Sequence, residues 1–295
     1  MPLFTGNWFG FGAKTGGEGP TAFSATGGDL SPQSGTAPGN GYRYHSFGSQ
    51  GTFTVTGDPH PGVEILCVGG GGAGGARNTG GSDGGAGGGG GGYVLATGVP
   101  LGPGTYTVTV GAGGEGSYPS PNGPTPNDYF GGDSIFSDGG PLVITAGGGG
   151  GGGSGPSRGP VGTAKGCGGG GGGGGGPPPG AISGGASQQP TVTQTGLTPP
   201  QFTQAGNSGG DSDHNAPHVG AGGGGTAENG SQRNQPTNTN GGPGGNGVQL
   251  PAWTGTLIGA PTINPYNGYY GGGGGGGAGG IGGGGHTNGG TGGSG

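Results

Sequence analysis

The stretch VEILCVGGGGAGG, at residues 63–75, runs from an apolar segment directly into nearly pure glycine. The same junction recurs at residues 141–153, which read PLVITAGGGGGGG, and at residues 105–114, which read TYTVTVGAGG. Short apolar runs bounded by glycine are typical of buried strands. The repetition predicts a chain that forms short strands and continues from their ends along glycine.

Glycine accounts for 102 of the 295 residues and proline for 27, whereas hydrophobic residues make up only 24%. The glycines come in blocks such as residues 168–176 instead of at every third position, which excludes a collagen triple helix. Ordered glycine loses more backbone entropy than any other residue, so an ordered chain of this composition needs dense backbone packing or burial against other copies. The alternative interpretation is that the blocks are flexible linkers.

Charge and hydropathy exclude several classes of partner. Charged residues make up 6% of the chain, the net charge is −6 and the six basic residues are scattered, whereas nucleic-acid binding calls for a clustered basic patch. No apolar stretch approaches the roughly 20 residues that span a bilayer. The N-terminus lacks the basic region and the unbroken apolar run of a secretory signal. We therefore expect no nucleic-acid partner, no membrane insertion, and synthesis in the cytoplasm, where Cys67 and Cys167 stay free thiols.

The patterning divides the chain into three parts: residues 1–41 as an N-terminal arm for docking or oligomerisation, residues 42–146 as an antiparallel β module, and residues 147–295 as a glycine-rich region with polar loops. Within the β module, alternation predicts a hairpin formed by residues 42–47 and 52–56. The apolar run at 63–68 predicts a strand in the middle of a sheet. Further strands are predicted at residues 93–97, 105–110, 135–136 and 142–145.

One packing mode of ordered glycine blocks is possible only because glycine has no side chain. Extended left-handed segments with three residues per turn can lie side by side and direct their N–H and C=O groups at neighbouring segments. A β-carbon pointing inward would push the segments apart. We therefore predict an all-β fold with almost no α-helix, in which a small antiparallel β-sandwich is followed by a polyglycine-II helix bundle.

The N-terminus is unusually rich in large apolar side chains for this composition. Such a segment either folds back onto the core or docks into a partner, and aromatic side chains are the usual anchors of buried interfaces. The docking candidates are Leu3, Phe4, Trp8, Phe9 and Phe11. We expect a homo-oligomer, with a homotrimer as the first candidate, because the chain has too few apolar residues for a large core of its own.

A family resemblance rests on the order of several segments: GTFTVTG at 51–57, VEILCVGGGG at 63–72, GTYTVTVGAGGEG at 104–116 and GGDSIF at 131–136. In this order they resemble the glycine-rich domains of bacteriophage tail-fibre and adhesin-type virion proteins, over about residues 42–155. The resemblance implies a sheet module that supports a polyglycine-II bundle, loops at the bundle tips that contact receptors on the host envelope, and location in the virion. By analogy, the N-terminus would bind other virion proteins.

Candidate recognition residues are confined to the polar interludes between glycine blocks. The side chains at residues 211–218 could bind a divalent ion, or the segment is simply a polar turn. The metal candidates are Asp211, Asp213, His214 and His218. Together with the rings of Trp253, Tyr266, Tyr269 and Tyr270, which can stack on sugars, they are also the candidates for contact with a host glycan.

No nucleophile with a base and no pair of carboxylates is readable, so we predict that the protein is not an enzyme and needs no cofactor. The sequence favours a non-enzymatic virion protein, a short fibre or adhesin that presents loops to a host surface. Two alternatives stay open: a purely structural virion component that binds only other virion proteins, such as a neck or tail appendage or a decoration protein, and a glycine-rich ice-binding or matrix protein.

Overall fold

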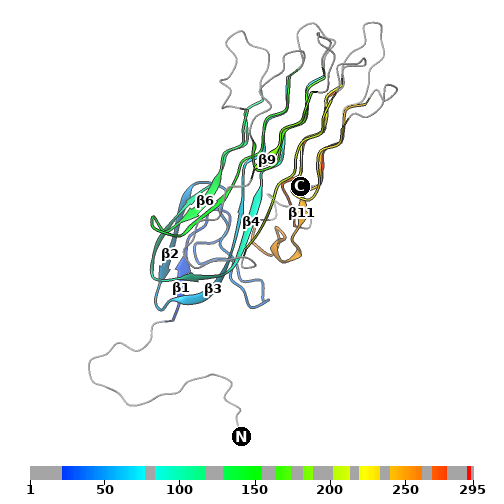
Figure 1. The fold of residues 1–295 in the computed structure, drawn as a ribbon. Coiled ribbons are helices and arrows are strands. Elements are labelled where there is room, and N and C mark those ends of the chain that lie inside the picture. The colour runs from blue at the N-terminus through cyan, green and yellow to red at the C-terminus, as the bar shows by residue number, and fades with distance from the viewer. Residues whose placement is uncertain are drawn as a thin grey trace, which may run out of the picture.

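The structure is a computed structural model of the chain, and it describes ten stretches: residues 22–76, 84–116, 129–154, 164–173, 182–188, 202–212, 219–232, 240–260, 268–277 and 291–293. The described residues form a β-sandwich at one end and a long bundle of glycine segments at the other (Figure 1). The only helical element among them is a single 3-10 turn, η1 (Pro251–Trp253). The predicted all-β fold with almost no α-helix is therefore confirmed.

One face of the sandwich is an antiparallel five-stranded sheet in the order β1-β2-β5-β6-β7. Its strands are β1 (Ser24–Thr26), β2 (Gly51–Thr56), β5 (Gly104–Thr109), β6 (Ser134–Ser137) and β7 (Val143–Ala146). The β2 and β5 strands pair with Phe53 opposite Tyr106, and β5 and β6 pair with Val108 opposite Phe136. Alternate residues of these strands are buried, as expected of a sheet with one covered face.

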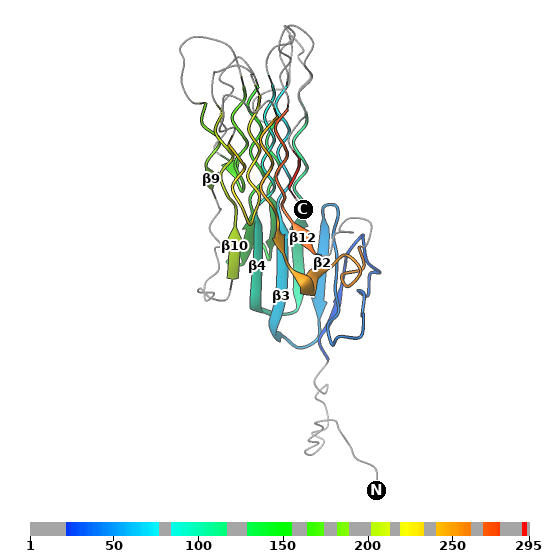
Figure 2. The ribbon, with the colours of Figure 1, turned by 90° about the vertical axis from the view of Figure 1, so that its right-hand side faces the viewer.

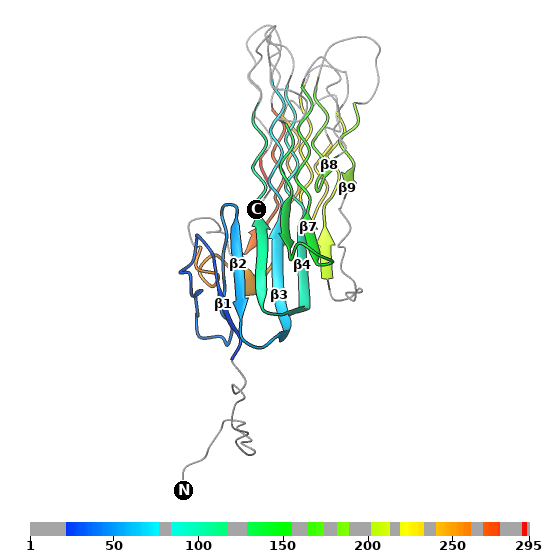
Figure 3. The same ribbon diagram turned by 90° about the vertical axis from the view of Figure 1, so that its left-hand side faces the viewer.

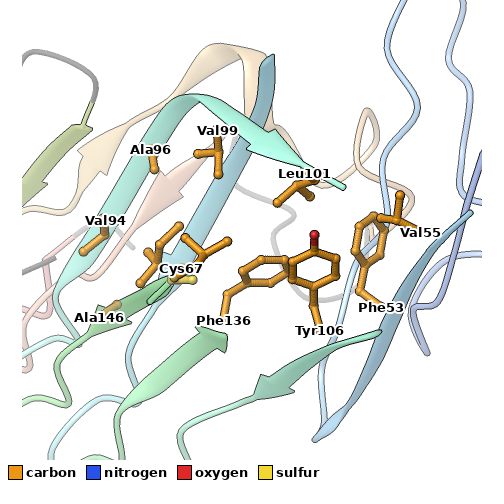
Figure 4. Close-up of a cluster of buried hydrophobic side chains, with 12 residues drawn as sticks. Phe53, Val55, Cys67, Val94, Ala96, Val99, Leu101, Tyr106, Phe136 and Ala146 are labelled. Atoms are coloured by element: carbon orange, nitrogen blue, oxygen red, sulfur yellow. The ribbon is translucent and has the colours of Figure 1, made fainter. Parts of the chain in front are cut away.

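The other face is a three-stranded sheet in the order β10-β4-β3. It consists of β3 (His60–Val68), β4 (Tyr93–Leu101) and β10 (Phe202–Ala205), and β4 lies in the middle. Between the two sheets lies the hydrophobic core (Figure 4). The rings of Tyr106 and Phe136 stack there with their centroids 5.2 Å apart, and Ile144 and Leu101 are almost fully buried beside them.

Four short strands lie outside the sandwich. The β11 (Val248–Gln249) and β12 (Tyr269–Tyr270) strands pair antiparallel where the glycine bundle begins. The β8 (Ala164–Lys165) and β9 (Ser187–Gln188) strands pair parallel, beside the bundle (Figure 3).

Two local predictions are wrong. Residues 42–47 do not form a hairpin with β2, because β1 and β5 occupy both edges of that strand. The segment instead makes an isolated bridge between Thr36 and Tyr44, and its buried Ser46 hydroxyl donates to the Ile258 carbonyl at 2.6 Å. The second error concerns β3, which lies at the edge of its sheet instead of in the middle.

The glycine segments extend away from the sandwich side by side (Figure 2). We call these segments glycine rods and name each by its residues. The described rods are 69–76, 84–92, 111–116, 129–133, 147–154, 166–173, 182–186, 206–212, 219–226, 228–232, 240–247, 271–277 and 291–293. Several continue directly from strands of the sandwich, for example rod 69–76 from β3 and rod 147–154 from β7.

Hydrogen bonds between rods repeat every three residues. Successive N–H groups of rod 219–226 donate to rod 271–277, then to rod 166–173, then to rod 228–232, and the cycle repeats. Its carbonyls accept from three different rods, 84–92, 206–212 and 240–247. A three-residue period with bonds directed only at neighbours is the arrangement of polyglycine II. The predicted polyglycine-II bundle is confirmed, with rod 219–226 at the centre of a hexagon.

The bundle leaves almost no room for side chains. A β-carbon built on Gly223 would lie 2.0 Å from the Gly88 carbonyl oxygen, and one built on Gly171 would lie 2.3 Å from that of Ile182. Real β-carbons do not approach backbone atoms so closely. The exclusion is not absolute, because the methyl groups of Ala73, Ala86 and Ala221 are buried inside the bundle.

The chain alternates between the sandwich and the bundle instead of completing one before starting the other. Rods 69–76, 84–92, 111–116 and 129–133 all lie between strands of the predicted β module, residues 42–146. Conversely, β10 comes from the predicted glycine-rich region and completes a sheet of the sandwich. The β1 strand comes from the predicted arm, residues 1–41, and pairs with β2.

We predict different effects for the same substitution at two adjacent positions of rod 69–76. A β-carbon at residue 72 would lie 2.1 Å from the Gly150 carbonyl oxygen, so Gly72→Ala should separate two rods and destabilise the protein by about 1–3 kcal/mol for each broken hydrogen bond. At residue 71 the nearest atom, the Gly89 carbonyl oxygen, is 3.8 Å away. Gly71→Ala should therefore leave the melting temperature unchanged or raise it slightly. Equal melting temperatures for the two variants in calorimetry would contradict the packing described above.

Candidate functional site

The end of the bundle that faces away from the sandwich is the candidate functional site, and we call it the far end. Many of the described rods end here, and the residues that follow them in the chain lie outside the described residues. The described rod ends that flank those segments include Ala76, Gly84, Ser154, Ser212 and Val219. At the far end, residues with side chains can therefore be attached directly to rigid rods.

Polar side chains tie the rod ends together at the far end. The Ser154 hydroxyl accepts the Ala76 N–H at 2.9 Å, and the buried Ser212 hydroxyl donates to the Gly172 carbonyl at 2.6 Å. The backbones of Ile182 and Ser212 exchange two hydrogen bonds, of 2.8 and 2.9 Å. These contacts hold neighbouring rod ends at fixed separations, as a platform for binding loops requires.

Asp211 is the one predicted metal ligand that lies within the described residues. Its carboxylate accepts the Gly184 N–H at 2.8 Å and the Gln232 side-chain amide at 3.2 Å, so both oxygens link rods to one another. Asp213, His214 and His218 lie outside the described residues. The part of the chain that the structure describes contains no group of three or more metal-ligating side chains. The metal site at residues 211–218 stays a prediction.

The predicted ring residues lie at the opposite end of the bundle from Asp211. Trp253, in η1, packs edge-on against Tyr44 with ring centroids 5.8 Å apart, and its carbonyl accepts the Tyr270 hydroxyl. Tyr269 and Tyr270 form β12 beside the sandwich, and both are half-buried. Tyr266 lies outside the described residues. The structure therefore does not bring Trp253, Tyr269 and Tyr270 together with Asp211 in one site.

Thr226 is a structural residue that sequence reasoning missed. It is buried where the central rod reaches the sandwich, its hydroxyl donates to the Tyr270 carbonyl at 2.6 Å, and the same oxygen accepts the Val248 N–H at 2.7 Å. It thereby anchors β11 and β12 to the base of rod 219–226. The available signal was a threonine directly after four glycines, which by itself does not indicate a partner.

The predicted N-terminal docking residues, Leu3, Phe4, Trp8, Phe9 and Phe11, all lie outside the described residues. The first described residues lie at the end of the sandwich that faces away from the bundle (Figures 1 and 3). There the Phe23 ring contacts that of His60 with centroids 5.0 Å apart. The chain therefore enters the sandwich at the end opposite to the far end of the bundle.

Both cysteines are free and buried. Burial raises the pKa of the Cys67 thiol to about 12 and that of Cys167 to about 11. Both thiols therefore stay protonated at neutral pH, where a reactive cysteine nucleophile would be a thiolate.

The raised thiol pKa values predict a loss of stability in alkali. The thiols lose their protons more readily in the unfolded chain, near the ordinary pKa of 9.0, than in the folded protein, near 11 and 12. Their contribution is therefore complete below pH 9.0 and is lost as the pH rises through the folded values. Denaturant titrations of wild type and of Cys67→Ala/Cys167→Ala should give unfolding free energies whose difference changes above that pH. Parallel pH profiles for the two proteins would refute the linkage.

Comparison with known proteins shows a family for this chain. The model of a family described as a glycine-rich domain matches residues 45–295. No curated protein and no solved structure matches the chain. No helix among the described residues has both the length and the apolar character that crossing a membrane requires.

Proposed function

This protein belongs to the glycine-rich domain family, and we propose that it is a non-enzymatic bacteriophage virion protein. In this proposal it is a short fibre or adhesin: residues at its N-terminal end bind other virion proteins, and loops at the far end of the bundle recognise the host surface.

The observation that carries the proposal is the separation of the two ends by a bundle that excludes side chains. The first described residues lie at the free end of the sandwich, and the described rods extend from the sandwich toward the opposite end (Figure 1). Between the two, rods such as 84–92, 147–154 and 271–277 are nearly pure glycine, because a β-carbon at most of their positions would meet a carbonyl of the next rod. Such a rod bundle is a spacer, and binding sites are commonly built on loops that a rigid scaffold holds in place.

The resemblance to bacteriophage tail-fibre and adhesin-type proteins supports the more specific part of the proposal. The segments that carry the resemblance form β2, β3, β5 and β6, together with the rods that adjoin them. They make up most of the sandwich, and the family model covers them too.

A purely structural virion component is the second candidate, and one observation favours it. The carboxylate of Asp211 and the rings of Trp253 and Tyr44 make contacts within the protein, so the described part of the predicted receptor site is already used for packing. In that case the loops only connect rods, and the bundle binds other virion proteins.

Alanine substitution of the loop that follows rod 206–212 separates the two candidates. Asp213→Ala/His214→Ala/His218→Ala should reduce binding of the purified protein to host cells, and its competition with infection, by about tenfold if two or three hydrogen bonds to a glycan are lost. Asp211 is left in place because it joins rods. Asp58→Ala, which removes an exposed carboxylate from the sandwich, is the matched control and should bind like wild type. Unchanged binding for this loop and for each other far-end loop in turn would favour the structural component.

Deletion of residues 1–12 tests the attachment end. Because this segment carries the five docking candidates, we expect the shortened protein to keep its melting temperature but to be absent from purified particles. A homotrimer held by the same residues should fall to a lower mass in light scattering. Normal incorporation together with an unchanged mass would show that attachment and assembly use another surface.

A further inference from the structure

The hydrogen bonds of the bundle follow one rule, which makes an incomplete position easy to recognise. Every third N–H of a rod points in the same direction, so a rod has three rows of donors and three rows of acceptors. In rod 219–226 all six directions meet another rod. A row without a partner therefore marks a place where one more rod would fit.

Rod 84–92 has one such row. Its carbonyls accept from three rods, 69–76, 166–173 and 271–277. Two of its donor rows bind rods 147–154 and 219–226. The third donor row consists of the N–H groups of Gly85, Gly88 and Gly91, and none of them has a backbone acceptor within the described part of the chain. All three residues are buried, and a buried N–H without a partner is costly.

The rods on either side supply the matching acceptors. In rod 69–76, the carbonyls of Gly69, Gly72 and Gly75 accept no backbone N–H from the described residues. In rod 271–277 the same holds for the carbonyls of Gly272 and Gly275. In the hexagon around rod 219–226, each row of donors or acceptors points at one neighbouring rod. If the same pattern holds around rod 84–92, the two carbonyl rows and the donor row of rod 84–92 all point at one position between rods 69–76 and 271–277.

Among the described residues, no further rod occupies this position. A β-carbon on Gly71 or Gly74 would lie no closer to rod 84–92 than 3.8 and 3.7 Å, which is ordinary van der Waals contact, whereas one on Gly274 would make a tight contact of 3.3 Å with the Gly88 nitrogen. These three glycines are exposed. By contrast, β-carbons on Gly69, Gly70, Gly72 and Gly75 would each lie within 2.2 Å of a carbonyl oxygen. Gly71 and Gly74 are thus glycines that the fold of the single chain does not require.

We propose that this position, which we call the edge groove, binds an extended glycine-rich segment of another polypeptide in polyproline-II form. The groove is floored by Gly85, Gly88 and Gly91 and flanked by Gly71, Gly74 and Gly274. Carbonyls of the bound segment accept from the floor, and its N–H groups donate to the two flanking rods. The bound segment completes the hexagonal packing around rod 84–92.

The geometry restricts the bound segment to glycine-rich chains. Its bonding groups must recur every three residues, about 9 Å apart at 3.1 Å per residue, which suits neither a β-strand with its two-residue period nor an α-helix. A side chain pointing at the rods would meet carbonyls at the distances that exclude β-carbons elsewhere in the bundle. Gly71 and Gly74 then have a reason to be glycine, because a methyl group there would occupy the space of the bound backbone.

A labelled synthetic peptide tests the proposal on the full-length protein. The probe has about eight glycines, enough to span the groove at 3.1 Å per residue, between lysine pairs that keep it soluble. Fluorescence anisotropy should show saturable binding to wild type, and hydrogen exchange should slow at the amides of Gly85, Gly88 and Gly91. A peptide of the same length with alanine at alternate positions should not bind.

Two alanines provide the matched variant. Gly71→Ala/Gly74→Ala should keep the fold yet weaken peptide binding by at least about tenfold, a loss of about 1.4 kcal/mol. Gly102→Ala, at a glycine with nothing within 4 Å and far from the groove, should bind like wild type. The molecular masses of wild type and of the double variant in solution are measured alongside. A wild-type homo-oligomer that the two alanines dissociate would support the proposal, and a second copy of the chain would then supply the bound segment. Absence of peptide binding to monomeric wild type, or equal binding by the double variant, would overturn it.

Discussion

The structure depends on backbone hydrogen bonding between extended segments that are mostly glycine. An isolated extended glycine segment satisfies none of its own N–H and C=O groups, and glycine loses the most entropy on ordering. In rod 219–226 this is offset because neighbouring rods surround it on six sides and bond its groups in three-residue cycles. The stability of each rod therefore depends on the presence of the others, and glycine is the side chain that allows them to approach.

The sandwich brings the rods together by holding the strands that lead into them side by side. Strands held in register by a hydrophobic core emerge next to one another, and β3, β5 and β7 pass directly into rods. Returning rods lead back into β4 and β6, so the rods between strands have at least one end fixed by the sheets. A core built around Tyr106, Phe136 and Ile144 is small, but it only has to align the first residues of each rod. Beyond that point the three-residue bonding pattern maintains the alignment.

The different roles of the sandwich and the bundle determine where residues that bind a partner can be located. The interior of the bundle tolerates an occasional small side chain, as at Ala221 and Cys167, and excludes side chains at most other positions. Functional groups are thus restricted to the two ends and to the outer rods. At the far end, Ser154, Asp211 and Ser212 use their side chains to fix rod ends. At the edge groove, backbone groups alone form the binding surface, which selects a partner by its conformation and its lack of side chains.

The sequence by itself determined the two kinds of structure and the junctions between them. Apolar runs that pass into glycine, as at Val68 and Ala146, identified strand ends and rod starts, because glycine blocks admit few arrangements that satisfy the backbone. The long-range order was decided only by the tertiary structure. Residues 42–47 alternate like a strand, yet β1 and β5 already occupy the edges of β2. The β10 strand has too little pattern of its own and exists because β4 offers a free edge.

The candidate site shows the same limit. Sequence reasoning placed functional side chains in the interludes, but it grouped Asp211 with Trp253 and Tyr270, which the structure places at opposite ends of the bundle. The sequence could not predict this separation, because glycine rods carry no side-chain pattern that indicates which block lies beside which. Rod 84–92 adjoins rods that lie more than a hundred residues away in the chain, such as 219–226 and 271–277. Only the direction of its hydrogen bonds in the folded bundle distinguishes one glycine from the next. The same property explains why a β-carbon fits at Gly71 but not at Gly72.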